Sequence, residues 1–531
     1  MNKSMKQLTQ FAAYAIAALS VVACSSEDSA QQDNAKQNTT KGVATFDGSQ
    51  PSNDTRALTR TTATYTLGGD AKVFWTSTDK IFVQDDANTF HQSGAANLYN
   101  PSNKAKAIFS LASGSFTLNN REVRYTGENG TDANTVTIAS TQTQTTANDF
   151  SHLGTSGDCG TATATGSNGN YTFTLNHKAS YLCFVPRCMN TDLGPNIKLT
   201  KIKVTADQPI AGKYDFSTGS LAQKAGETYS NTVTLNTSDF SLNTTTSSLA
   251  TNGAYMVVAP GTYNFTITYT IKDPTTNVEG DIVKTISSYN CQVGKINDIT
   301  AWIDKDIRDY SSKKYYMWDA VNHYWNGYET EQPTLPQYLT GATFGAHYPQ
   351  NSTDSRWYHV GGGSIHANST CQICPNGNEV FWYAYKGDPH WDTSTLWCTM
   401  GHLYKTGLWV KKKSKIISDE HITAAYMENG FKNAHGIYVN WKNTFAGDAD
   451  VPADIVPKFT AVPNKNDYFY LPATGFYENG RLYATGVGGN YWSADAVPTR
   501  NTYSYGFRFY KEYVNVQIMP RTVGRKAQSF E

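Results

Sequence analysis

The chain has 531 residues, and its 44 Lys and Arg balance 44 Asp and Glu, so it has no formal net charge at neutral pH. With only 17% charged residues it is a poor candidate for binding nucleic acid, because phosphate neutralisation needs clustered Lys and Arg. Its 39% hydrophobic residues exclude an intrinsically disordered protein, and its 34 Tyr and 41 Gly favour strands joined by turns in about three domains.

The N-terminus has the features of an export signal. Lys3 and Lys6 precede an apolar run, residues 11–22, that is shorter than the about 20 residues a membrane-spanning helix needs. The run ends in Val-Val-Ala-Cys24, which resembles the lipobox of bacterial lipoproteins. The resemblance implies a lipid (palmitate) on Cys24 and an outer-membrane lipoprotein precursor at the cell surface. The alternative is an ordinary secretory signal with an incidental Cys.

Residues 25–60 are polar and low in complexity, which is typical of a linker, with one strand-like stretch at 42–48. From residue 61 to residue 304, short β-patterned runs alternate with Gly, Asn and Asp turns. The pattern predicts two β-sandwiches, at 61–168 and 169–304.

Residues 305–531 differ in composition: nine of the eleven Trp lie from Trp318 onward. A helix is predicted after Asn376, with Glu379 completing a capping box and Gly387 as the stop. A second helix is predicted at 419–428. Strands are predicted at 468–470, 482–484 and 505–510, so we expect an α+β domain with long loops.

Residues 42–304 contain five local strings: Thr55-Arg-Ala57, Trp75-Thr-Ser-Thr-Asp-Lys-Ile81, Phe173-Thr-Leu-Asn-His-Lys-Ala179, Ala259-Pro-Gly-Thr-Tyr263 and Gln292-Val-Gly-Lys295. In this order and spacing they resemble the fimbrillin family, the pilins of type V pili, which are exported as lipoproteins. The resemblance implies tandem transthyretin-like β-sandwiches. It also implies that an Arg-specific protease cuts after Arg56 or Arg60, frees residues 42–48, and opens an apolar groove for donor-strand addition by other pilin subunits. The alternative is that both are ordinary linker arginines. We expect His177 to be a hydrogen-bonded, half-buried residue and not a ligand.

The last segment contains six further strings, at residues 315–320, 374–379, 387–392, 471–475, 488–493 and 506–509. Together they resemble the C-type-lectin-like domains of lipoprotein families and pilus tips. The resemblance implies a fold and not an activity. Because this domain occupies the end from which stalk pilins donate a strand, we predict a fimbrial tip subunit and adhesin. The alternative is a monomeric surface lipoprotein that binds glycan or protein without polymerising.

No motif for catalysis is present: the chain has no Gly-x-Ser-x-Gly elbow, no HExxH and no phosphate loop. We therefore predict neither enzyme activity nor a cofactor. An undetected hydrolase would require a cleft with perturbed carboxylates or a metal.

Several weaker hypotheses concern binding by the last domain. A Cys3His zinc site would need Cys371, Cys374 and Cys398 with His366 or His390, while an oxidising exterior favours pairing Cys398 with Cys371 or Cys374, and buried free thiols are the third possibility. Asp388 and Asp392 are candidate calcium ligands or parts of a capped turn. An exposed aromatic platform for a sugar or protein ligand would draw on residues that are otherwise core: Trp391, Trp397, Trp409, Tyr383 and Tyr385.

Overall fold

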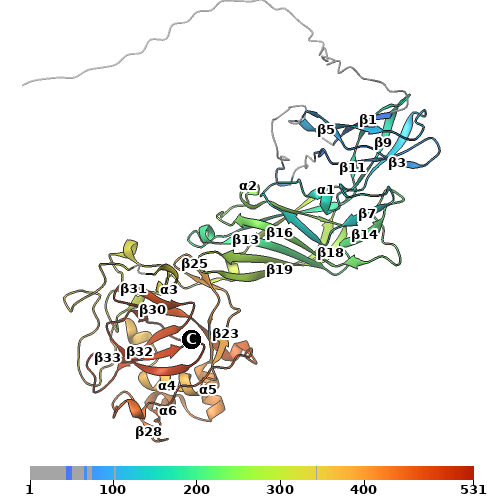
Figure 1. Cartoon of the computed structure of the whole chain (residues 1–531). Coiled ribbons are helices and arrows are strands. Elements are labelled where there is room, and N and C mark those ends of the chain that lie inside the picture. Colours follow the sequence, from blue (N-terminus) through green and yellow to red (C-terminus); the bar gives the residue numbers. More distant parts are fainter. Residues whose placement is uncertain (1–43, 51–64, 69–73, 101–102, 342–343) are drawn as a thin grey trace, which may run out of the picture. The chain divides into compact units, whose positions relative to one another are not determined.

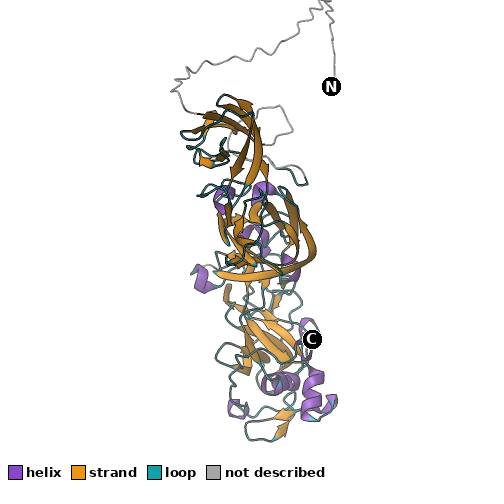
Figure 2. Ribbon diagram, turned by 90° about the vertical axis from the view of Figure 1, so that its right-hand side faces the viewer, coloured by secondary structure: helices purple, strands orange, loops and turns teal. Residues whose placement is uncertain are grey.

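The computed structural model describes residues 44–50, 65–68, 74–100, 103–341 and 344–531 (Figure 1). Strands far outnumber helices, so the prediction of a mainly β protein is confirmed (Figure 2). Within these ranges, no helix is long and apolar enough to cross a lipid bilayer. The predicted lipidation site Cys24 and the predicted cleavage sites Arg56 and Arg60 lie outside the described residues.

The first domain is a single nine-stranded sheet around an aromatic core that includes Phe46, Trp75, Phe109 and Phe173. Alternate residues of its strands point into this core, which is the period-2 pattern expected of strands with one buried face. In spatial order its strands are β3 (Phe90–Gln92), β2 (Phe82–Gln84), β6 (Asn120–Tyr125), β9 (Gly160–Ser167), β10 (Asn170–Thr174), β1 (Ala44–Ser49), β5 (Asn103–Leu111) and β4 (Asn97–Asn100), with β11 (Asn176–His177) beside β9.

The second domain has three sheets around the largest core of the chain. The first sheet is β17 (Ala254–Val258), β12 (Ser180–Arg187) and β20 (Ile296–Trp302); the second is β19 (Val278–Cys291), β18 (Gly261–Asp273), β13 (Lys198–Ala206), β16 (Thr232–Ser241) and β8 (Thr141–Gln144); the third is β15 (Tyr229–Ser230), β14 (Ala211–Asp215) and β7 (Thr135–Ile138). Its short helices are α1 (Leu153–Ser156), α2 (Leu249–Asn252) and the 3-10 turn η1 (Gly194–Asn196).

The strand pairing does not match the predicted boundary at 168/169. β7 and β8 precede that boundary but pair with β14 and β16 of the second domain. β10 and β11 follow it but pair with β9 of the first domain. Along the chain, strands of the second domain therefore come before strands that complete the first domain. Turn signals in the sequence do not reveal this order.

In its described residues, the last domain, from η2 (Asp304–Asp306) onward, combines four sheets with four helices. The largest sheet has β22 (Tyr315–Tyr316), β35 (Arg525–Lys526), β32 (Gly489–Ala496), β30 (Thr474–Glu478) and β31 (Arg481–Thr485). In the same sheet, β33 (Tyr503–Phe509) pairs with β32, and β34 (Val514–Pro520) pairs with β33. The smaller sheets contain β21 (Arg308–Asp309), β24 (Trp397–Thr399) and β25 (His402–Tyr404); β23 (His390–Asp392), β26 (Gly407–Lys411) and β29 (Tyr468–Pro472); and β27 (Phe431–Lys432) with β28 (Tyr438–Val439). The helices are α3 (Gln337–Thr340), α4 (Gly377–Lys386), α5 (Lys413–Glu420) and α6 (Ala424–Asn429), and the 3-10 turns are η3 (Glu329–Glu331), η4 (Thr370–Ile373), η5 (Asp448–Asp450) and η6 (Lys465–Asp467).

The predicted helix at residues 377–386 is confirmed as α4, with Asn376 and Glu379 forming a reciprocal capping box. The helix predicted at 419–428 is instead two short helices. α5 ends at Glu420, the following residue His421 adopts the left-handed conformation, and Thr423 caps the start of α6. The three predicted strands are confirmed as parts of β29, β31 and β33.

Candidate functional site

Strand β1 occupies the middle of the first sheet. It runs parallel to β10 and antiparallel to β5, so it is hydrogen-bonded along both edges. At its ends, the amide of Thr45 donates to the carbonyl of Gly169 at 2.7 Å, and the amide of Gln50 donates to the carbonyl of Ala105 at 3.0 Å. Removing β1 from this arrangement would leave β5 and β10 as two facing, unpaired edges.

The inward side of β1 belongs to the domain core. Ala44, Phe46 and Gly48 are buried, whereas the alternating residues are only half-buried. The Phe46 ring, with 0% exposure, stacks on Tyr171 with centroids 4.7 Å apart and meets the edge of Phe116 at 5.5 Å. Burial of a Phe side chain contributes about 1.5–3 kcal/mol. β1 therefore stabilises the domain through its core as well as its hydrogen bonds.

Two side chains from other strands and loops hold the C-terminal end of β1. The indole nitrogen of Trp75 donates to the carbonyl of Gly48 at 3.2 Å. His177 bridges the Gln50 side-chain oxygen (2.9 Å) and the carboxylate of buried Asp158 (2.8 Å). His177 is thus a satisfied, partly buried histidine, as expected from the sequence.

After β1, the next described residue is Tyr65, which is anchored in the second domain. Its side chain is buried in the second-domain core, and its hydroxyl donates to Asp298 at 2.7 Å. Arg56 and Arg60 therefore lie in sequence between two anchored segments, β1 on one side and Tyr65 on the other. A cut after either arginine would leave β1 attached only by non-covalent contacts.

Asp79 is a second buried acid in the first domain. Tyr125 donates its hydroxyl to one carboxyl oxygen at 2.7 Å, and the amide of Thr76 donates to the other at 2.7 Å. Burial outweighs these hydrogen bonds and raises the pKa of Asp79 to about 6. Sequence reasoning did not single out this residue, although it lies in the Trp75–Ile81 string.

The five aromatic residues proposed for a ligand platform do not form one. Trp397 and Tyr383 are buried in the core of the last domain, and the hydroxyl of half-buried Tyr385 donates to the carbonyl of Pro452 at 2.7 Å. Trp409 donates to Asp392 at 2.9 Å. The physical reason is that an irregular domain with long loops needs large rings to fill its core.

Trp391 lines a surface cavity with a volume of about 490 Å³, and the other four aromatic residues do not line this cavity. Phe459, which is 59% exposed, contributes a ring to this cavity. No periodic pattern in the sequence distinguishes Phe459, because this residue lies in a loop. The remaining lining is Thr393, Thr406, Gly486, Val487, Lys511 and Glu512.

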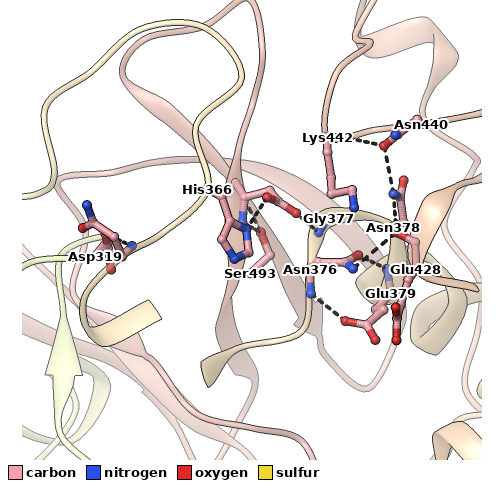
Figure 3. A network of polar contacts seen from close by, with 12 residues as sticks. Asp319, His366, Asn376, Gly377, Asn378, Glu379, Glu428, Asn440, Lys442 and Ser493 are labelled. Carbon is pink, nitrogen blue, oxygen red and sulfur yellow. Dashed lines mark hydrogen bonds and ion pairs between the residues drawn. The ribbon is translucent and has the colours of Figure 1, made fainter. Parts of the chain in front are cut away.

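A polar network surrounds the start of α4 (Figure 3). Asp495 accepts hydrogen bonds from the amide of Gly377 at 2.6 Å and contacts His366 at 2.8 Å. The buried amide of Asn378 donates to the Glu428 carbonyl at 2.9 Å and to the Asn440 side chain at 3.0 Å. The donors and acceptors satisfy one another, so the network stabilises the helix start and the loops packed on it.

The cysteines do not support the zinc hypothesis. Cys371 and Cys374 lie in a small core with Trp318, whereas Cys398 packs into the second-domain core. The predicted pairing of Cys398 with Cys371 or Cys374 is therefore wrong in this structure, and all seven cysteines in the described ranges are buried free thiols. Over the same ranges, no cluster of three or more His, Cys, Asp or Glu that could hold a metal ion is found.

The two candidate calcium ligands are occupied by protein donors. Asp388 contacts the ammonium group of Lys458 at 2.6 Å and accepts from the hydroxyl of Tyr468 at 2.8 Å. Asp392 accepts from the amide of Ser394 at 2.7 Å and closes a turn. This arrangement fits the capped-turn alternative.

Comparison with known proteins finds no matching family profile and no matching curated protein. Among solved structures, the chain is similar to a "putative cell adhesion protein" of Bacteroides ovatus, with 14% identity over 48% of this chain and 91% of that one and a TM-score of 0.30. A second "putative cell adhesion protein", from Bacteroides uniformis, has 15% identity, 50% and 94% coverage and a TM-score of 0.29. "Putative polysaccharide binding proteins" of Bacteroides thetaiotaomicron have 7% identity, 48% and 90% coverage and a TM-score of 0.23.

Proposed function

We propose that this protein is a cell-surface fimbrial subunit and adhesin that accepts a strand from a neighbouring subunit after cleavage at Arg56 or Arg60. Export as a lipoprotein anchored at Cys24 is part of the proposal. The observation that carries it is the position of β1: a six-residue strand completes the first sheet from a chain segment that precedes both arginines.

The contacts of β1 explain why a cut would create a binding site. Once severed, the strand keeps its two ladders of hydrogen bonds and the Phe46 contacts but loses its covalent link to the domain. Its departure exposes two strand edges and the apolar floor under Phe46. Such edges pair readily with an extended segment of another chain.

The last domain supports a terminal place in the fimbrium. Strand β35 lies between β22 and β32, and Phe530 is buried in the domain core. The hydroxyl of Tyr383 donates to the Glu531 carboxylate at 2.9 Å. Because residues 525–531 are packed into their own domain, these residues are unsuited to serve as a donor strand, which supports the proposed tip role.

Adhesion would use the last domain, and the Trp391–Phe459 cavity is its candidate contact surface. Aromatic rings beside hydroxyl and charged groups suit a glycan or a protein loop. This cavity equally serves the alternative function, a monomeric surface lipoprotein that binds its ligand without polymerising.

The decisive experiment is mass spectrometry of the mature N-terminus in cell-surface material, with and without an inhibitor of Arg-specific proteases. A chain that begins at Ala57 or Thr61 only without inhibitor supports strand exchange. A chain that always begins at lipidated Cys24 contradicts it and leaves the monomeric binder. A variant with both Arg56→Ala and Arg60→Ala should remain uncut, whereas the matched control Lys41→Ala should be processed normally.

A further inference from the structure

We infer that the slot left by β1 selects its incoming strand at two positions: an aromatic ring where Phe46 lies, followed two residues later by glycine where Gly48 lies. The inference rests on the proposed strand exchange and adds the chemical identity of the partner. That partner is an extended segment of another protein subunit that carries the pattern aromatic-x-Gly and runs in the direction of β1.

The glycine requirement comes from the floor of the slot. A Cβ atom at Gly48 would lie 2.5 Å from Cζ and 2.9 Å from Cε1 of Phe173, and 3.1 Å from Cε2 of Phe109. These separations are shorter than van der Waals contact, so any side chain there displaces at least one ring.

The Phe173 ring has little room to move aside. It is 5% exposed, and its centroid lies 6.2 Å from that of Phe109 and 6.3 Å from that of Trp75. Trp75 also fixes the distance of the strand backbone from the core, because its indole N–H donates to the carbonyl of Gly48 at 3.2 Å. An incoming strand that keeps this hydrogen bond places its own residue against Phe173.

The aromatic requirement comes from the neighbouring position. Phe46 is fully buried, lies nearly parallel to the Tyr171 ring with a 7° angle between the planes, and meets Phe116 edge-on. A small side chain here would leave a cavity, since the surrounding rings belong to β10 and to the loop before β6 and cannot collapse freely. Ring size at this position and absence of a side chain at the next inward position therefore act together.

The outward positions are not selected in this way. Thr45 and Asp47 are half-buried, and their side-chain partners, Asn170 and Tyr99, lie on the solvent side. Backbone pairing with β5 and β10 fixes the direction and register of any occupant without regard to these side chains.

The test uses the full mature chain cut by an Arg-specific protease, with loss of the β1 fragment verified by mass. Labelled peptides of residues 42–52 are then added and their binding measured by fluorescence anisotropy. We expect the natural peptide and its Asp47→Ala variant to bind within about threefold of each other. Phe46→Ala should weaken binding by at least about 100-fold, and Gly48→Val by at least about 30-fold.

The outcomes separate the two proposals. If β1 cannot be released, or the natural peptide does not bind the emptied protein, strand exchange at this slot is wrong and the proposed function fails. If the natural peptide binds but Gly48→Val or Phe46→Ala binds equally well, strand exchange stands and the two-position selection is wrong. If Asp47→Ala weakened binding as much as Phe46→Ala and Gly48→Val do, the two-position selection would also be wrong. Because all changes are in the peptide, folding of the protein is not affected.

Discussion

The first and last domains close their cores with strands taken from opposite parts of the chain. In the first domain, β1 enters from a segment that precedes Arg56 and Arg60 and pairs with β5 and β10. In the last domain, β35 enters between β22 and β32, and Phe530 follows it into the core. Both devices remove unpaired edges. Only the first strand precedes Arg56 and Arg60 in the chain, so the proposed cleavage would open the first core and leave the last core closed.

The largest expected effect is on the first core. Phe46→Ala should lower the free energy of unfolding of the first domain by about 3–5 kcal/mol, because it removes a fully buried ring from a close-packed aromatic cluster. Hydrogen exchange of β5 and β10 amides should accelerate strongly, while exchange in the last domain stays unchanged.

Thr45→Ala is the matched control for that change, since Thr45 is adjacent on β1 but faces outward. It should alter exchange in β5 and β10 only slightly. If Phe46→Ala and Thr45→Ala gave the same exchange rates, β1 would not be a structural part of the core in solution.

In the last domain, Phe530→Ala should lower the free energy of unfolding by about 3 kcal/mol. Its ring is buried against Tyr383 and Phe507, with centroid separations of 5.3 and 5.4 Å. Amides of β29 and β33 should exchange faster, and those of β5 should not. The neighbouring exposed residue supplies the control, Ser529→Ala, which should leave both sets unchanged. Faster exchange in β5 would show that the two cores are energetically coupled.

The contrast between these domains also shows where sequence reasoning succeeds. The local pattern predicts the strand at 42–48, and the capping residues predict α4, because alternation and capping are set by neighbours in sequence. The partners of β1 could not be predicted, since β5 and β10 are selected by long-range packing. For the same reason the domain boundary was misplaced at β7 and β8.

The candidate ligand site was harder to predict than the β1 slot. Aromatic residues serve both cores and contact surfaces, so composition could not separate buried Trp397 from Trp391, which lines the cavity. Phe459 has no periodic context at all. Likewise, the spacing of Cys371 and Cys374 says nothing about the distant Cys398, whose location depends on the tertiary fold.

Asp79 should make the stability of the first domain depend on pH by about 2–3 kcal/mol. Burial raises the pKa of Asp79 to about 6, whereas an unfolded aspartate titrates near about 3.9. Between these values the folded state retains a proton that the unfolded state has released. The free energy of unfolding therefore falls as the pH rises from about 4 to 6, and this contribution is constant above that window.

Asp79→Asn should remove this slope, because an amide does not titrate. The comparison is of slopes and not of absolute stability, since an amide cannot accept both of the hydrogen bonds that the carboxylate accepts from Tyr125 and Thr76. The exposed Asp132→Asn variant should keep the wild-type slope. An unchanged slope in Asp79→Asn would assign the pH dependence to other groups.

The smallest effect tests the local rule that predicted α4. Asn376 accepts the amide hydrogen of Glu379 at 2.9 Å, and Glu379 accepts that of Asn376 at 2.9 Å. Asn376→Ala should lower the free energy of unfolding by about 1 kcal/mol and speed hydrogen exchange of the first α4 amides. Asn376→Ser keeps a capping oxygen and should therefore retain most of the protection against exchange. If alanine and serine behaved alike, packing of α4 against β33 and β34, and not its cap, would determine where the helix begins. The start of α4 would then depend on long-range contacts, although the residues that predict it are neighbours in the sequence.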